Sequence, residues 1–144
     1  MPPCANQRAS AMAAVIAPAG SGAVSAQSQR LNVVASNLAN VDAVAGPDGS
    51  VYKARQVVFQ TVPMGNDGSA GVKVNAISED STPGRRIHDP SHPLADGEGY
   101  VTHSNVSAVD EMVNMISASR SYQNNVEVMN TAKSLLLKTL QMGQ

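Results

Sequence analysis

Imidazole and carboxylate side chains gather in one segment of this sequence. At short spacing, such groups can bind zinc or another divalent metal. The group comprises His88, Asp89, His92, Asp96 and His103. The spacing typical of a helical zinc site is broken, because Pro90 lies between the first two histidines and Pro93 follows them. We therefore interpret these side chains as solvated loop residues. A secreted metal-binding or enzymatic domain that uses His88, His92 and Asp96 stays the alternative.

Other signatures of catalysis or ligand binding do not occur in the sequence. No G-x-S-x-G elbow marks a nucleophilic serine. Gly65, Gly68 and Gly71 are spaced by three, but the Lys-Ser or Lys-Thr of a phosphate loop does not follow them. Cys4 is the only cysteine, which excludes an intramolecular disulfide and a cysteine-based zinc cluster. We therefore expect a protein that is not an enzyme, with no cofactor, no metal and no small-molecule substrate.

Composition narrows the class of protein further. Ten Lys and Arg against eleven Asp and Glu leave a formal net charge of −1, so a nucleic acid is not an expected partner. Hydrophobic residues make up 42% of the 144 residues, yet aromatic residues make up only 3%. Aromatic rings normally supply much of the buried area of a core. A compact core built by this chain alone would therefore be thin, which favours a subunit of an assembly.

Glycine and proline divide the chain into parts. Neither residue occurs from Tyr100 to Met142, and most of both lie between Asp42 and Gly99. Since both residues break helices, the distribution predicts one long C-terminal helix and an irregular middle. Ser107 and Asp110 resemble a capping box at the start of that helix. We expect the helix over about 106–141, within a C-terminal region at 105–144.

Apolar residues recur in alternating steps of three and four near both ends of the chain, which is the pattern of a coiled-coil seam. The pattern predicts an N-terminal helix at 21–42, after a disordered segment at 1–20. We expect the two helices to pair as a coiled coil. The residues expected at the assembly interface are Leu31, Val34, Leu38, Val41, Met112, Met115, Ile116, Tyr122, Val126, Met129, Leu136 and Leu140.

The central region at 43–104 is predicted to contain β structure and loops. Residues 51–62 are rich in Val, Tyr and Phe, and residues 72–76 alternate between apolar and polar side chains. We expect these two segments to form a β-hairpin, followed by an irregular arm at 78–99 and a short strand at 100–102. The predicted fold is thus mainly α with a small β part.

The outer faces of both predicted helices carry neutral polar side chains in place of Lys and Glu. Residues 21–42 contain only two charges, Arg30 and Asp42. Neutral polar groups can be buried at much smaller cost than charges if they are hydrogen-bonded. We therefore expect both faces to be buried in an assembly. An ordinary two-helix domain with a surface rich in Ser and Asn is the alternative.

Motifs at both ends and in the middle of the chain resemble those of bacterial flagellar rod and hook proteins. The terminal motifs are Ser25-Ala-Gln-Ser-Gln-Arg-Leu-Asn32, Ala35-Ser-Asn-Leu-Ala-Asn40 and the segment 111–130, which begins Glu-Met-Val-Asn-Met-Ile. The central segments Gly46-Pro-Asp-Gly49, Tyr52-Lys-Ala-Arg-Gln-Val-Val-Phe59 and Asp89-Pro-Ser-His-Pro-Leu-Ala-Asp96 narrow the resemblance to the proximal rod.

The resemblance implies a structural subunit of the basal-body rod, which crosses the periplasm and transmits torque from the rotor to the hook. The implied partners are other rod proteins, copies of the chain itself, the protein at the junction of rotor ring and rod, and the type III export apparatus. Residues 11–17, followed by Ala17-Pro18-Ala19, imitate a secretory signal. Export of the implied kind would leave that segment uncleaved.

Overall fold

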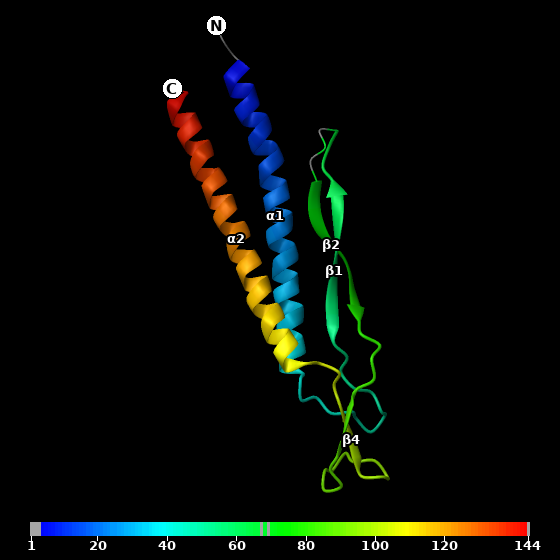
Figure 1. The fold of residues 1–144 in the computed structure, drawn as a ribbon. Coiled ribbons are helices and arrows are strands. Elements are labelled where there is room, and N and C mark those ends of the chain that lie inside the picture. The colour runs from blue at the N-terminus through cyan, green and yellow to red at the C-terminus, as the bar shows by residue number, and fades with distance from the viewer. Residues whose placement is uncertain (1–3, 67, 69, 144) are drawn as a thin grey trace. The chain divides into compact units, whose positions relative to one another are not determined.

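Two long helices and four strands make up the part of the chain that the structure describes. The structure is a computed structural model that describes residues 4–66, 68 and 70–143, with side chains described from Ser21 onward. In chain order the elements are α1 (Cys4–Ala39), β1 (Arg55–Pro63), β2 (Ala70–Glu79), β3 (Arg85–His88), β4 (Tyr100–His103) and α2 (Ala108–Met142) (Figure 1). The predicted class, mainly α with a small β part, is confirmed at this level.

Helix α2 agrees with the sequence prediction to within two residues. It begins at Ala108, directly after Ser107, whose backbone oxygen accepts a hydrogen bond from the Glu111 N–H at 3.0 Å. Asp110 and Glu111 lie in its first turn, where acidic side chains complement the positive end of the helix dipole. The absence of Gly and Pro lets the helix continue without interruption to Met142.

Helix α1 is longer than predicted. It begins at Cys4, so the residues from there to position 20, which we expected to be disordered, are helical. Five alanines between positions 9 and 17 explain the difference, because alanine has the highest intrinsic helix propensity. The helix ends at Ala39, three residues before the predicted end at 42. There the Asn40 side chain donates to the Ser36 backbone oxygen at 2.8 Å and closes the last turn.

The described residues form two compact units, and both helices contribute to each of them. The first unit comprises residues up to 29, residues 59–75 and residues from 118 onward. In it, Ala26 and Ala118 are buried. A Cβ atom added to Gly22 would lie 3.1 Å from the Val72 backbone oxygen. Glycine at this position therefore lets α1 approach the backbone of β2 closely.

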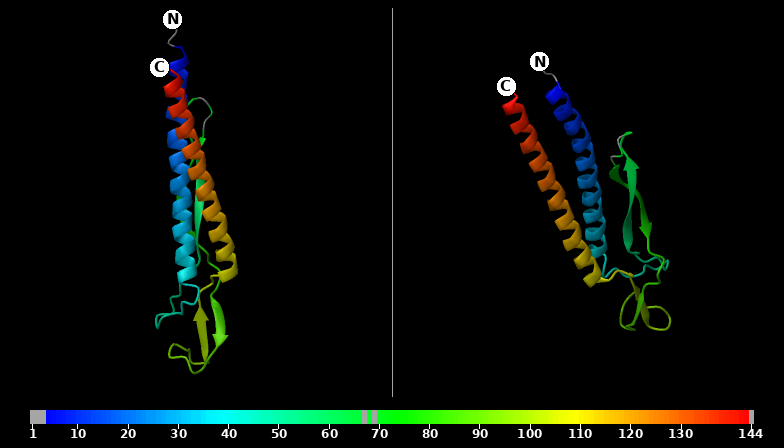
Figure 2. Two further views of the ribbon diagram at one scale, coloured as in Figure 1. Left: turned by 90° about the vertical axis from the view of Figure 1, so that its left-hand side faces the viewer. Right: turned by 45° about the horizontal axis from the view of Figure 1, so that its top comes forward.

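The second unit comprises residues 30–58 and 76–117. Its small sheet pairs β3 with β4 in antiparallel register, with Ile87 opposite Val101, and the two strands lie side by side (Figure 2). Val101 is fully buried, and Val34, Ala54 and Val106 are buried with it in this unit. The isolated bridge between Val44 and His103 extends the pairing to the segment after α1.

The β structure of the middle differs from the prediction at one strand. The expected strands at 51–62, 72–76 and 100–102 correspond to β1, β2 and β4, which are each shifted or lengthened by a few residues. The arm at 78–99 was wrongly predicted to be wholly irregular, because it contains β3. The four residues of β3 show no period of their own, and it is the pairing with β4 that makes them a strand.

Candidate assembly interface and asparagine clamp

The predicted interface residues of the N-terminal helix lie in the last turns of α1 and in the turn that follows it. Val34 is buried, and Leu31, Leu38 and Val41 are half-buried. Val41 lies beyond the end of the helix, in the turn where its N–H donates to the Leu38 oxygen at 3.4 Å. All four side chains are therefore at least partly shielded within the subunit.

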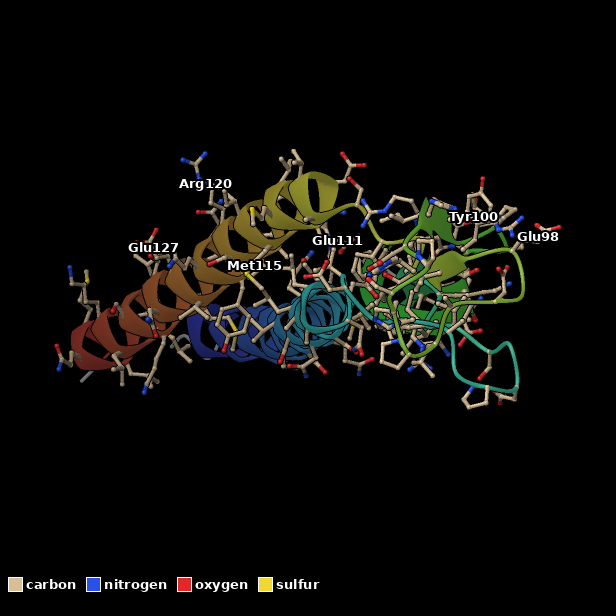
Figure 3. All side chains as sticks on the ribbon, turned by 90° about the horizontal axis from the view of Figure 1, so that it is seen from below. Glu98, Tyr100, Glu111, Met115, Arg120 and Glu127 are labelled. Atoms are coloured by element: carbon tan, nitrogen blue, oxygen red, sulfur yellow. The ribbon has the colours of Figure 1, made fainter. Side chains whose placement is uncertain are left out.

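The predicted interface residues of α2 fall into two groups. Met115, Tyr122, Val126, Met129 and Leu136 are half-buried. The remaining three, Met112, Ile116 and Leu140, are 56%, 60% and 52% exposed. Figure 3 shows Glu111 and Met115 on the side of α2 that faces the end of α1, whereas the exposed Arg120 and Glu127 point away.

An exposed row of apolar side chains runs along the first turns of α2. Val109, Met112, Val113 and Ile116 are between 56% and 71% exposed. Their spacing of i, i+3, i+4 and i+7 places them on one face of the helix. We call these four residues the apolar row. A contiguous exposed apolar surface of this kind typically marks a contact with another molecule.

The most densely bonded side chain of the second unit belongs to Asn37, near the end of α1. It is 1% exposed. Its Nδ2 group donates to the Arg55 oxygen at 2.8 Å and to Glu111 Oε2 at 3.2 Å. Its Oδ1 atom accepts from the Tyr52 hydroxyl at 2.8 Å and from the Arg55 N–H at 3.0 Å. Two donors and two acceptors are the full capacity of a side-chain amide, so Asn37 is saturated.

Tyr52 extends this network back to α1. Its hydroxyl gives its one proton to Asn37, so the Ser36 hydroxyl must be the donor in the 3.1 Å contact between Ser36 and Tyr52. The Arg55 guanidinium lies over the Tyr52 ring at 5.6 Å and pairs with Glu79 at 3.3 Å. Both partners of that ion pair are about half exposed, so we assign it little stabilisation.

A second asparagine, Asn105, lies in the segment that leads into α2. Its Oδ1 atom accepts from the Ala54 N–H at 2.7 Å, and its Nδ2 group donates to the Thr82 oxygen at 2.9 Å and the Asp80 oxygen at 3.2 Å. The Asp80 N–H in turn donates to the Ala54 oxygen at 2.8 Å. The backbone N–H and C=O groups of Ala54 and Arg55 are thereby all paired. We call Asn37, Asn105 and the Ala54–Arg55 backbone between them the asparagine clamp.

The clamp corrects one expectation from the sequence. We expected the neutral polar face of the N-terminal helix to be buried by neighbouring molecules, but Asn37 of that face is buried within the subunit. Asn32, five residues earlier on the same helix, is exposed. The polar face of this helix therefore contains both exposed residues, such as Asn32, and a residue that is buried within the subunit, Asn37. The polar face and the motif Ala35-Ser-Asn-Leu-Ala-Asn40 both contain Asn37, but neither indicates that it is buried.

The histidine and aspartate segment does not assemble a metal site. Within the residues that the structure describes, no group of three or more His, Cys, Asp or Glu side chains could hold a metal ion. His88 packs edge-on against the Tyr100 ring at 5.0 Å, and His92 Nδ1 accepts the Leu94 N–H at 3.1 Å. His103 lies on β4, half-buried. His88 and His92 thus serve local packing and a turn.

The aspartates of the segment stabilise loops. Asp96 Oδ1 accepts the N–H groups of Glu98 and Tyr100, both at 2.9 Å, and its other oxygen accepts from Arg86 at 3.0 Å. The Tyr100 N–H contributes most to lowering the pKa of Asp96 from its ordinary value of 3.8. Asp89 accepts from the Ser91 hydroxyl at 2.6 Å, which lowers its pKa in the same way. The ionised carboxylates thereby hold these loops in defined turns.

Comparison with known proteins identifies similar chains over most of the length. Residues 19–47 match the family described as "Flagella basal body rod protein", and residues 98–142 match "Flagellar basal body rod FlgEFG protein C-terminal". A relative from Yersinia enterocolitica, named "Flagellar basal-body rod protein FlgC", is 60% identical over 122 residues, which are 85% of this chain and 91% of the relative. Proteins of the same name from Escherichia coli O157:H7 and Salmonella typhimurium strain LT2 are 57% and 56% identical, with the same coverage.

The matched regions include both asparagines of the clamp but not its Ala54–Arg55 backbone. Asn37 lies in the first matched region, and Asn105 and Glu111 lie in the second. The relatives are structural rod proteins, so the metal-binding or enzymatic alternative is not favoured. Among the described helices, none is long and apolar enough to cross a membrane. With identities of 50–60% over most of its length, the chain belongs to the FlgC family of flagellar basal-body rod proteins and is a structural subunit of the rod.

Proposed function

We propose that this rod subunit belongs to the proximal part of the rod and transmits torque from the rotor toward the hook. The observation that carries the proposal is the apolar row on α2. Four apolar side chains that are more than half exposed in the subunit need cover from other molecules. A rod made of many copies and related proteins supplies that cover.

Pairing of α1 and α2 as a coiled coil is part of the proposal. The seam residues recur in steps of three and four in both helices. The Asn37–Glu111 hydrogen bond joins the two helices at one point in the second unit, and Met115 faces α1 from the next turn of α2. The twelve interface residues predicted above would then serve two purposes, with the half-buried ones in the pair and the exposed ones in contacts between subunits.

Heterologous contacts between subunits would build the rod. A surface that contacts a different surface on the next copy generates an open helical assembly in place of a closed ring. The proposed partners are copies of the chain, other rod proteins, the protein that joins the rotor ring to the rod, and the type III export apparatus that delivers the subunit across the inner membrane. No cleaved signal is expected, and the rod would lie in the periplasm-spanning part of the basal body.

Complementation tests the proposal. The full chain is expressed in flagellated cells from which the endogenous relative has been deleted, and basal bodies are purified. We expect restored swimming, the chain present in the purified basal bodies, and a mass that shows an intact N terminus. Cells that stay non-motile while the chain accumulates as a soluble, processed periplasmic protein would contradict it. A vector without insert is the control.

A further inference from the structure

A recess lies next to the apolar row, at the start of α2. It has a volume of about 450 Å³, and its walls come from residues at the start of β3 and from those that lead from β4 into α2. Val109 belongs to the recess and to the row alike. The recess and the row therefore form one continuous surface of the second unit, which we call the docking face. The recess is lined by Thr82, Pro83, Arg85 and residues 104–109.

The charges of the docking face are separated. Asp110 is exposed on α2 beside the row, and no Lys or Arg occurs from residue 108 to residue 119. The recess instead contains Arg85, which is exposed. Within the part of the chain that the structure describes, its guanidinium forms no ion pair and no hydrogen bond. A partner that fits this surface brings cations to the row and hydrogen-bond acceptors to the recess.

The C-terminal end of α2 has apolar side chains that need such a surface. They are Leu135, Leu137, Leu140 and Met142, which are between 51% and 87% exposed. A helix turns by about 100° per residue, so Leu135 and Leu137 point to nearly opposite sides. A flat surface cannot cover both sides, whereas a recess can take in the end of the helix.

The polar groups of this helix end also match the docking face. Lys133 and Lys138 are exposed, and no Asp or Glu occurs from residue 128 to residue 143. The last backbone carbonyl groups of a helix have no partners within the helix, and an arginine side chain can donate to them. The end of α2 thus offers cations for Asp110 and acceptors for Arg85.

We propose that the docking face receives the C-terminal end of α2 from a second copy of this chain. Leu137 and Leu140 of one copy then pack against the row and the recess of the next. Lys138 lies near Asp110, and Arg85 donates to the last carbonyl groups. Because the two surfaces differ, the contact repeats without closing and extends an open assembly. The inference deepens the proposed function and rests on it, since the contact forms as subunits join the rod.

Disulfide cross-linking in assembled rods tests the contact. Cys4 is first replaced by Ala, and Val113→Cys and Leu140→Cys are then combined in one chain. The two positions are about 40 Å apart along one helix, so a disulfide between them must join two copies. After mild oxidation of purified basal bodies, we expect a ladder of dimers and longer products on a denaturing gel. The ladder should be at least tenfold stronger than in either single-cysteine variant.

Asn32→Cys combined with Leu140→Cys is the matched control, because Asn32 is exposed in the second unit but lies outside the docking face. This control should give no ladder. Motile cells in which the variant at Val113 and Leu140 gives no ladder would overturn the proposal. A product that contains only a different rod protein would overturn it as well, because the occupant would then not be a copy of this chain.

Exchange of charges provides a second measurement. Asp110→Lys and Lys138→Glu should each lower incorporation into basal bodies about threefold, and the two changes together should restore it to within about twofold. A change that only weakened the helix would not be rescued by its partner. Additive losses in the combined variant would contradict the pairing of Asp110 with Lys138.

The cysteine-free chain separates this inference from the proposed function. If that chain enters basal bodies and restores swimming while the cross-link fails, the proposed function stands and the contact is wrong. If it does not enter basal bodies, the proposed function is contradicted. Oxidation of the purified double-cysteine chain at high concentration then decides the contact, which a ladder would support and the absence of a ladder would refute.

Discussion

Glu111, which is bonded to the asparagine clamp, and the apolar row lie side by side on α2, yet their surroundings are opposite. Glu111 of the network is buried and hydrogen-bonded, while Met112 beside it is more than half exposed. The clamp satisfies polar groups inside the subunit, and the row presents apolar groups that the subunit leaves uncovered. The comparison teaches that one helix can hold a fold together on one side and offer an association surface on the other.

Charged substitutions in the apolar row should have the largest effect on assembly. They should also separate assembly from folding, because the row is exposed in the subunit. We expect Val113→Asp combined with Ile116→Asp to abolish incorporation into basal bodies, because two carboxylates would enter a dry contact. The free energy of unfolding of the monomer should change by only about 0.5 kcal/mol, since both side chains are exposed. Purified basal bodies and thermal melting of the monomer measure the two effects.

Gln123→Asp on the same helix is the control for the double variant, because Gln123 is exposed and polar already. It should swim normally. Normal swimming of the double variant would show that the row stays open in the rod and that the proposed separation of the two regions is wrong.

The C-terminal end of α2 tests whether the association surface continues beyond the row. Leu136 is half-buried and Leu140 is 52% exposed. Truncating a buried leucine typically costs about 2–5 kcal/mol, and a carboxylate in its place costs more. We expect Leu136→Asp or Leu140→Asp to be exported normally but not to enter the rod.

Export is followed by the amount of chain in the periplasm, and entry by its presence in basal bodies. Ser134→Asp, at an exposed polar position two residues before Leu136, is the control. Wild-type motility of a variant that carries both Leu136→Asp and Leu140→Asp would limit the association surface to the start of α2.

The next prediction concerns the packed interior of the second unit, to which the clamp belongs. Gly84 lies close to β4 there. A Cβ atom on Gly84 would collide with the His103 backbone oxygen and lie 2.9 Å from Thr102 Cγ2. Backbone atoms cannot move aside cheaply, so Gly84→Ala should lower the free energy of unfolding by about 1–3 kcal/mol. Urea unfolding of the full chain measures this.

Gly97→Ala is the matched control, because no atom beyond its two chain neighbours lies within 4 Å of the added Cβ. It should leave the urea midpoint nearly unchanged. Equal midpoints for the two variants would mean that the second unit is less firmly packed than the clamp implies.

Acid should loosen the loops of the second unit while leaving the bonds of the two clamp asparagines to backbone groups in place. Hydrogen bonds lower the pKa values of Asp48, Asp80, Asp89 and Asp96 below 3.8, chiefly from Ser50, Thr82 and Ser91 hydroxyls and from the Tyr100 N–H. A lowered folded-state pKa stabilises the fold above 3.8, and this contribution is lost as the pH falls through the folded-state pKa.

We therefore expect no change between neutral pH and about pH 5, and faster exchange of the Glu98 and Tyr100 amides below about pH 3.8, relative to intrinsic rates. In Asp96→Asn, exchange at these two amides should lose its dependence on pH in that range. A transition centred well above pH 4 would point to a different group.

Substitution of the loop histidines should have the smallest effect on assembly and swimming. His88 is exposed and His92 half-buried, and their contacts are a ring packing and a turn. We expect His88→Ala combined with His92→Ala to leave incorporation and swimming nearly unchanged. Swimming assays and a metal analysis of the unaltered chain measure this. Loss of assembly together with stoichiometric metal in the parent would contradict it.

The sequence predicted the elements better than it predicted their junctions. The stretch from Tyr100 to Met142 without Gly or Pro located α2, and the alternation of residues 72–76 located β2. Neither β3 nor the clamp leaves a local signal. Arg85 pairs with His103, and Asn37 reaches Glu111, which is 74 residues away in the chain. Such partners follow from tertiary structure, so composition and periodicity could not indicate them.

The aspartates that close the loops also have a consequence for the lifetime of the protein. Loop tips are the usual sites at which proteases cut a folded chain, because cleavage needs several residues to become extended. In this chain, Asp48, Asp80 and Asp89 each bind the residue two positions later, so every such loop would first have to break its own turn. The loops of the second unit should therefore resist nicking at neutral pH.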